Sequence, residues 1–248
     1  MEILHLDYRP GTAGLILPLQ SRLQGSGVPQ LRERYSRWKE LGLAELGMAV
    51  ATRFSLTLRV ASRLAELLQR LRDEIEESGQ IDELLDGGYV YTPKDSRALY
   101  DICTAVDAFY FEYRSCYEVV GRFARTFCTE MLRKSITEEQ LVAVLQSAGV
   151  TTNWITSLRE NRKLFFHETA PWIALQVHER HPVKCSMVVM KENVEELKDP
   201  ATFITQDQIV ATIDGLQRGL WAIHNWLKSQ IDDIEASIVA DVSNRADG

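Results

Sequence analysis

The fold class follows most directly from residues 205–238, which read TQDQIVATIDGLQRGLWAIHNWLKSQIDDIEASI. Apolar residues recur there in steps of three and four, which keeps them on one side of an α-helix. They are Ile209, Ile213, Leu216, Leu220, Ile223, Leu227, Ile231, Ile234 and Ile238. Because Thr205 followed by Gln208 is the pattern of a capping box, we expect a long helix to begin here.

Two further tracts show the same spacing, from Leu46 to Ile75 and from Leu99 to Met131. Both are free of proline, which costs about 3 kcal/mol inside a helix. Shorter helices are expected at Leu141–Ala148, behind a second capping box at residues 137–140, and at Trp154–His167. The sequence therefore predicts an all-α protein, an antiparallel bundle of about five main helices.

The remaining segments contribute a small appendage and an arm. The apolar run Val183–Met190 predicts a strand, and Glu2–Tyr8 is its candidate partner, so we expect a two-stranded or irregular appendage. Residues 9–30 are rich in Gly, Pro, Gln and Ser and are interpreted as loop. The expected organisation is an N-terminal arm or loop at residues 1–30 followed by a single helical domain at 31–248.

Charge and composition limit the functional classes. Lys and Arg total 28 against 35 Asp and Glu, a net charge of −7, so the chain is not basic overall and any nucleic-acid binding must be local. No apolar run reaches the roughly 18 residues that cross a bilayer, and Met1–Asp7 lacks the basic start of a signal peptide. We therefore expect a cytoplasmic protein with reduced thiols at its four cysteines, Cys103, Cys116, Cys128 and Cys185.

One short motif carries the functional argument. Residues 158–168 read LRENRKLFFHE, with four residues between Arg162 and His167. Arg162 falls on the apolar stripe of its predicted helix, where an unpaired cation is costly to bury, so it needs a partner or an interface. His167 lies about 140° away around an ideal helix. The two side chains therefore meet only if the helix ends or a second chain contributes, and Pro171 favours an ending nearby.

The motif resembles that of the HEPN superfamily, in which four to six residues separate an arginine from a histidine. The resemblance implies a helical bundle of the toxin or defence type that forms homodimers, so that two protomers build one site that cleaves RNA without a metal or other cofactor. It also implies an antitoxin or nucleotidyltransferase partner. In this interpretation His167 transfers protons and Arg162 stabilises the charged phosphorane, with Arg159, Asn161, Lys163 and Glu168 as candidate supporting residues.

Four arginines in the second long tract are candidate RNA-binding residues. Arg114, Arg122, Arg125 and Arg133 fall within an arc of about 100° if the tract is one continuous helix. They would then form a basic strip that binds phosphates. The structural alternative is a solvated face with salt bridges to nearby acids.

Other patterns have structural interpretations. Arg218 and His224 also match the motif spacing, but they flank the apolar stripe of the last helix and are expected to be structural. His178, His181 and Cys185 supply zinc-ligand residue types without a dependable fourth ligand, so no metal site is expected. The functional alternative to a nuclease is a non-catalytic HEPN-like helical module that binds or scaffolds a protein or nucleotide partner.

Overall fold

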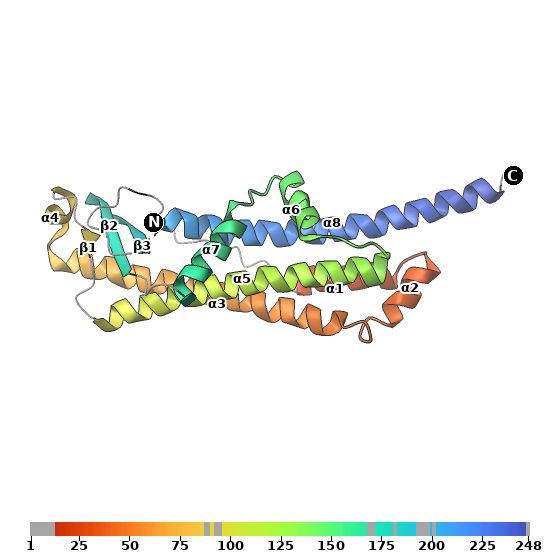
Figure 1. Ribbon diagram of the computed structural model, residues 1–248, viewed down its shortest axis with the longest axis horizontal. Helices are drawn as coiled ribbons and strands as arrows, with labels where there is room; N and C mark the ends of the chain where they lie inside the picture. The colour runs from red at the N-terminus through yellow and green to blue at the C-terminus, as the bar shows by residue number, and fades with distance from the viewer. Residues whose placement is uncertain are drawn as a thin grey trace. The chain divides into compact units, whose positions relative to one another are not determined.

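The computed structural model describes the backbone of residues 13–86, 90–91, 96–167, 172–180, 183–191, 199 and 202–246. Within these ranges the side chains at 13–14, 86, 90–91, 96, 162–167, 180, 183 and 239–246 are excluded from description. The helices are α1 (Ala13–Gln24), α2 (Pro29–Ser36), α3 (Leu43–Ser78), α4 (Ile81–Asp86), α5 (Ser96–Leu132), α6 (Glu138–Ser147), α7 (Asn153–His167) and α8 (Gln206–Ala246) (Figure 1). The strands are β1 (Val90–Tyr91), β2 (Trp172–Arg180), β3 (Val183–Met190) and β4 (Phe203–Thr205).

The expected fold class, mainly helical with a small β appendage, is confirmed, but the element counts are wrong. The described ranges contain eight helices rather than about five, and four strands rather than two. The candidate strand Glu2–Tyr8 lies outside the described residues. Strands β1 and β4 were not predicted because they are only two and three residues long, and the nine-residue β2 was not predicted either.

The three long helices confirm the periodicity argument. They are α3, α5 and α8, with 36, 37 and 41 residues. Helix α5 continues through Gly121 without interruption. Both predicted capping boxes form. The Thr205 backbone N–H donates to Gln208 Oε1 at 2.9 Å, and the Gln208 backbone N–H donates to Thr205 Oγ1. Thr137 and Gln140 make the equivalent two bonds. These caps satisfy N–H groups that a helix start would otherwise leave without partners.

The interpretation of residues 9–30 as loop is wrong, because α1 occupies Ala13–Gln24 despite an internal Pro18. Leu15, Leu19 and Leu23 follow one another in steps of four and are all buried. Burial of this apolar stripe outweighs the cost of the proline and organises the segment as a helix.

The chain divides into two compact units. The first is built from residues within 56–114 and 153–214, and the second from residues within 8–55, 115–152 and 215–248. Helices α3, α5 and α8 each contribute residues to both units. The expected boundary at residue 31 between an arm and a single domain stays a prediction.

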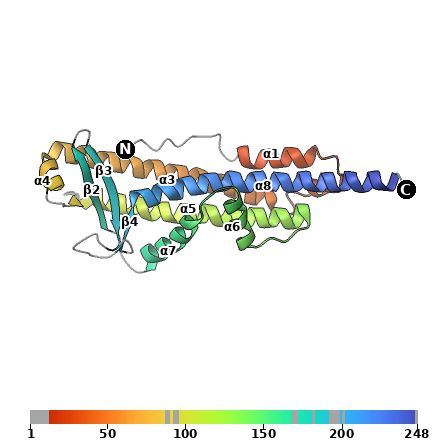
Figure 2. The ribbon, with the colours of Figure 1, turned by 90° about the horizontal axis from the view of Figure 1, so that it is seen from above.

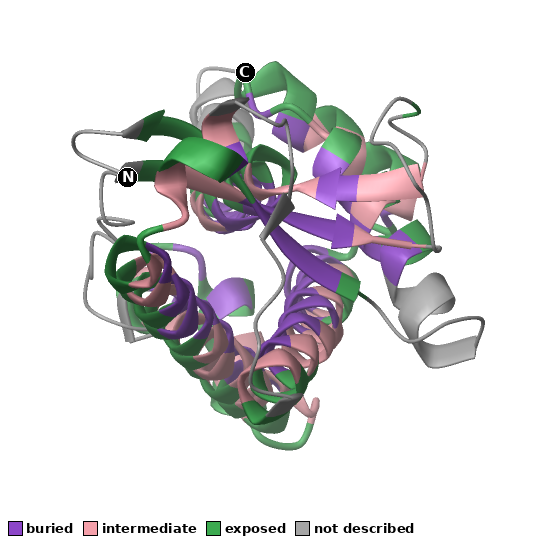
Figure 3. Cartoon of the chain, turned by 90° about the vertical axis from the view of Figure 1, so that its left-hand side faces the viewer, coloured by how far each residue is buried: buried purple, intermediate pink, exposed green. Residues whose placement is uncertain are grey.

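The first unit contains the sheet, which is antiparallel throughout in the order β1-β2-β3-β4. One face of β2 presents Ile173, Leu175 and Val177, all buried, and much of the sheet is accordingly purple in Figure 3. The sheet lies beside α4 and the C-terminal part of α3 (Figures 1 and 2). An alternating apolar strand packed on helices is the usual layer of an α+β unit.

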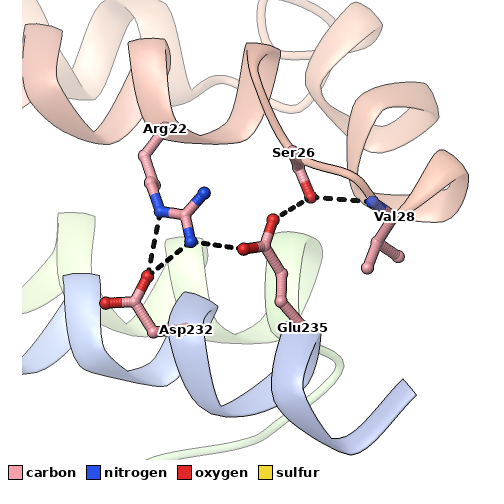
Figure 4. Close-up of polar contacts among 5 residues, drawn as sticks. All are labelled: Arg22, Ser26, Val28, Asp232 and Glu235. Atoms are coloured by element: carbon pink, nitrogen blue, oxygen red, sulfur yellow. Dashed lines mark hydrogen bonds and ion pairs between the residues drawn. The ribbon is translucent and has the colours of Figure 1, made fainter. Parts of the chain in front are cut away.

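In the second unit, polar contacts attach α1 to α8 (Figure 4). The Arg22 guanidinium donates to Asp232 Oδ1 at 2.9 Å and also binds the Glu235 carboxylate. Glu235 in turn accepts from the Ser26 hydroxyl, which caps the Val28 N–H at 3.1 Å. Shared partners fix one geometry better than an isolated surface ion pair does.

Among the described residues, no helix combines the length and the apolar character needed to cross a membrane.

Candidate functional site

Helix α7 carries the candidate catalytic motif, and its burial pattern shows which side faces inward. Its buried residues are Trp154, Ile155, Leu158 and Asn161. At 100° per residue, these four positions span an arc of about 120°. Position 162 falls inside this arc, whereas position 167 falls on the opposite side, among exposed residues that include Glu160. The expected placement of position 162 on the stripe agrees with this pattern.

Helix α7 remains helical up to and including His167, so it does not end between the two catalytic candidates. Their helix positions are therefore about 140° apart, and this geometry alone does not direct them at one point. The side chains of Arg162, Lys163 and His167, and all of Glu168, lie outside the described part of the chain. Of the candidate supporting residues, Arg159 is exposed and Asn161 is buried.

Asn161 anchors α7 against α5 immediately before Arg162. It is only 4% exposed, and its Nδ2 donates to Ser157 Oγ at 3.0 Å. Its side chain also makes a polar contact with the buried Tyr110 hydroxyl, which partly offsets the effect of burial in raising the pKa of Tyr110. The Ser157 bond lies within α7, so the contact with Tyr110 is the one that links this helix to α5. Asn161 therefore positions the segment that contains Arg162.

Removing this contact should destabilise the protein measurably. We expect Tyr110→Phe to lower the free energy of unfolding by about 1 kcal/mol, because the buried Asn161 amide loses a partner. Urea denaturation followed by circular dichroism measures the change. The matched control is Tyr100→Phe, since Tyr100 is 69% exposed. Equal stabilities of the two variants would show that the contact contributes nothing.

The face of α5 that contacts α7 also carries ionisable groups. Asp107 and Arg114 lie one turn to either side of Tyr110, and both are half-buried. Burial raises the pKa of Asp107, and its Oδ1 atom has no hydrogen-bond partner within the described ranges. Burial, followed by the charge of Asp107, raises the pKa of the Cys103 thiol. The region beside α7 thus disfavours charge on its acidic groups.

The expected basic strip is only partly present. Arg114 belongs to the first unit and the other three arginines to the second. In the second unit Arg122 is exposed and Arg125 is half-buried on α5. Arg133 lies beyond the end of α5 with a φ of 56°, so its placement on the helical arc is wrong. Its charge adds to burial in lowering the pKa of Arg34, which places two cations near each other at this end of the helix.

The zinc-ligand residue types do not converge among the described residues. His178 lies on β2 and contacts Ser186 Oγ at 2.5 Å, whereas Cys185 on β3 is paired with Val177. Cys185 and Ser186 are consecutive on β3 and therefore point to opposite faces of the sheet. His178 contacts Ser186, so it lies on the face away from Cys185. His181 is outside the described residues, within which no group of three His, Cys, Asp or Glu side chains could hold a metal ion.

The second motif match, Arg218 and His224, makes structural contacts. Arg218 Nη2 donates to the Gly149 carbonyl at 2.9 Å, behind the C-terminus of α6. His224 is buried, and its Nδ1 lies 2.8 Å from the Leu15 carbonyl, which can only accept, so Nδ1 carries the proton. Desolvation lowers the pKa of His224, beside a small apolar cavity lined in part by Leu19 and Phe123.

This burial makes His224 a source of pH dependence. Its pKa in the folded protein is below its ordinary value, so the unfolded chain binds more protons and stability falls as the pH drops below about 6.5. We expect part of the loss of stability between pH 7.5 and pH 5 to disappear in His224→Gln, measured by urea midpoints. The control is His178→Gln, because His178 is exposed. The same pH dependence in both variants would contradict the assignment.

Comparisons with family models, curated proteins and solved structures find no match to the chain. The candidate site therefore consists of the residues of α7 and their surroundings. These offer a guanidinium position on the inward side of the helix, an imidazole position on the outward side, and a buried amide between helices. A guanidinium that binds phosphate oxygens and an imidazole that transfers protons can together support phosphodiester cleavage without a metal.

Proposed function

We propose that the chain is a HEPN-like, metal-independent endoribonuclease that acts as a homodimer, with Arg162 of one protomer and His167 of the other at each site. The observation that supports this arrangement is the position of the two residues on α7. One falls inside the buried arc and the other about 140° away, so two copies of the helix supply the pair more readily than one.

The proposed chemistry is attack of the ribose 2′-oxygen on the adjacent phosphorus. His167 removes the 2′-hydroxyl proton, the P–O5′ bond breaks, and a proton is returned to the departing 5′-oxygen. Arg162 binds the equatorial oxygens of the phosphorane, because a guanidinium stays protonated and binds two oxygens at once. The products are a 2′,3′-cyclic phosphate and a 5′-hydroxyl.

The surrounding residues take supporting roles in this proposal. Asn161 links α7 to α5 through Tyr110, and Arg159, which is exposed, is proposed as a contact for RNA phosphates. Lys163 and Glu168 complete the candidate supporting set. Arg114, Arg122, Arg125 and Arg133 are proposed as phosphate contacts, and Arg122 and Arg133 are the exposed members of that set. The partner is an antitoxin or a nucleotidyltransferase, and the setting is cytoplasmic.

The experiment is incubation of the purified protein with mixed RNA in excess EDTA. We expect cleavage that persists in EDTA and leaves 2′,3′-cyclic phosphate ends. Cleavage that EDTA abolishes would contradict the metal-free mechanism. Absence of cleavage over a broad set of RNAs would favour the alternative, a non-catalytic helical module that binds a protein or nucleotide.

A further inference from the structure

Trp172 is an exposed aromatic residue close in sequence to the motif. It begins β2, five residues after His167, and is 50% exposed. Trp38 and Trp154 are buried, and Trp221 and Trp226 are half-buried. A half-exposed indole leaves a large apolar ring surface in contact with water, which is unfavourable. Its exposure therefore indicates a binding surface more strongly than the exposure of a small residue does.

The strand register extends this exposed aromatic into a row. Trp172 is the cross-strand partner of Met190, and Met190 is the partner of Phe203 on β4. Directly paired residues of antiparallel strands point to the same face of a sheet. Met190 and Phe203 are both partly exposed. Three neighbouring strands therefore present an indole, a thioether and a phenyl ring at one end of one face.

The covalent chain keeps this row near the motif. Trp172 lies five positions after His167, and a fully extended chain of that length spans at most about 18 Å. Both residues belong to the same compact unit. An RNA strand whose reacting phosphodiester lies at His167 therefore has bases within reach of Trp172, a few nucleotides along.

We propose that Trp172, flanked by Met190 and Phe203, stacks an unpaired base of the RNA next to the cleaved bond, so that the substrate is single-stranded RNA. This inference rests on the proposed function. Stacking on an aromatic side chain requires a base with a free face, which a loop or single strand offers and a duplex does not. Because every base has such a face, the platform selects for strandedness more than for sequence.

The test uses the full chain with His167→Ala, so that RNA is bound without turnover. The probe is a single-stranded oligoribonucleotide, compared with the same sequence annealed to its complement. We expect tryptophan fluorescence to be quenched by the single strand. Trp172→Ala should remove most of the quenching and weaken binding by about 10-fold, whereas Trp172→Tyr should retain most of the affinity. The matched control is Trp226→Phe, which should leave binding unchanged.

In the protein with His167 intact, the same substitution should separate KM from kcat. We expect Trp172→Ala to raise KM by about 10-fold with little change in kcat, because stacking holds ground state and transition state equally. A merely structural tryptophan would instead lower stability or affect both constants. Circular dichroism and the thermal midpoint of Trp172→Ala provide the check on folding.

Each outcome decides between the two proposals. Normal cleavage with unchanged KM in Trp172→Ala, or equal binding of duplex and single strand, overturns the stacking inference alone. Quenching that depends on Trp172 without any cleavage supports the stacking site and contradicts the nuclease. If the protein neither binds nor cleaves RNA, both proposals are overturned. A drop in oligomer mass of Trp172→Ala in sedimentation without RNA would place Trp172 in a contact between copies and overturn the inference.

Discussion

Replacing His167 by alanine is expected to lower the rate of RNA cleavage by about 10²–10⁴-fold, the range that a positioned general acid or base contributes. The fold should be retained, since position 167 is the last residue of α7 and lies opposite its buried arc. Initial rates on a fluorescent RNA in EDTA, with circular dichroism as the folding check, provide the measurement.

Arg162→Ala should cause a loss of similar size, because the phosphorane loses its fixed positive charge. Arg162→Lys keeps the charge but not the two-pronged donor geometry, so it should recover only part of the rate. The matched control is Thr156→Ala, an exposed position on the same helix with no assigned role, which should retain the full rate. Full activity in either His167→Ala or Arg162→Ala would contradict the assigned roles.

Phe109→Ala should have the largest effect on stability, about 3–5 kcal/mol. Phe109 is fully buried, stacked on Tyr113 with ring centroids 4.1 Å apart and edge-on to Tyr110 at 5.2 Å. The cavity also removes support from Tyr110, whose contact with Asn161 anchors α7.

The free energy of unfolding from urea titration measures this effect. Phe111→Ala is the matched control, because Phe111 lies on the same helix but is only half-buried, and it should cost much less. Equal losses in the two variants would contradict the placement of Phe109 at the centre of the packing.

The long helices could be predicted from sequence because their signal is local and redundant. In α8 nine apolar residues repeat one spacing behind a capping box, so no single residue decides the outcome. The signal for α1 was weaker: Pro18 and flanking glycines favour a loop, and only burial of Leu15, Leu19 and Leu23 makes the helix stable. Burial depends on distant segments, which a local pattern does not contain.

Strand β2 was missed although its signal is present. Ile173, Leu175 and Val177 alternate with other residues as in a half-buried strand. Without this strand, the exposure of Trp172 could not be predicted, because it depends on where the sheet begins. At the site, the sequence predicted a supporting role for Asn161 but not its contact with Tyr110, because the two residues are 51 positions apart.

The most direct test of the central claim, a catalytic site shared between two chains, is complementation between inactive variants. Arg162→Ala and His167→Ala proteins are prepared separately, mixed, allowed to exchange subunits, and assayed for RNA cleavage in EDTA. In a shared site, each mixed dimer retains one intact pair, so random exchange should restore about one quarter of the wild-type rate. If Arg162 and His167 of the same chain act together instead, or if the protein does not dimerise, every site in the mixture lacks one of the two residues. The mixture should then remain as inactive as its components, and that result would contradict the account.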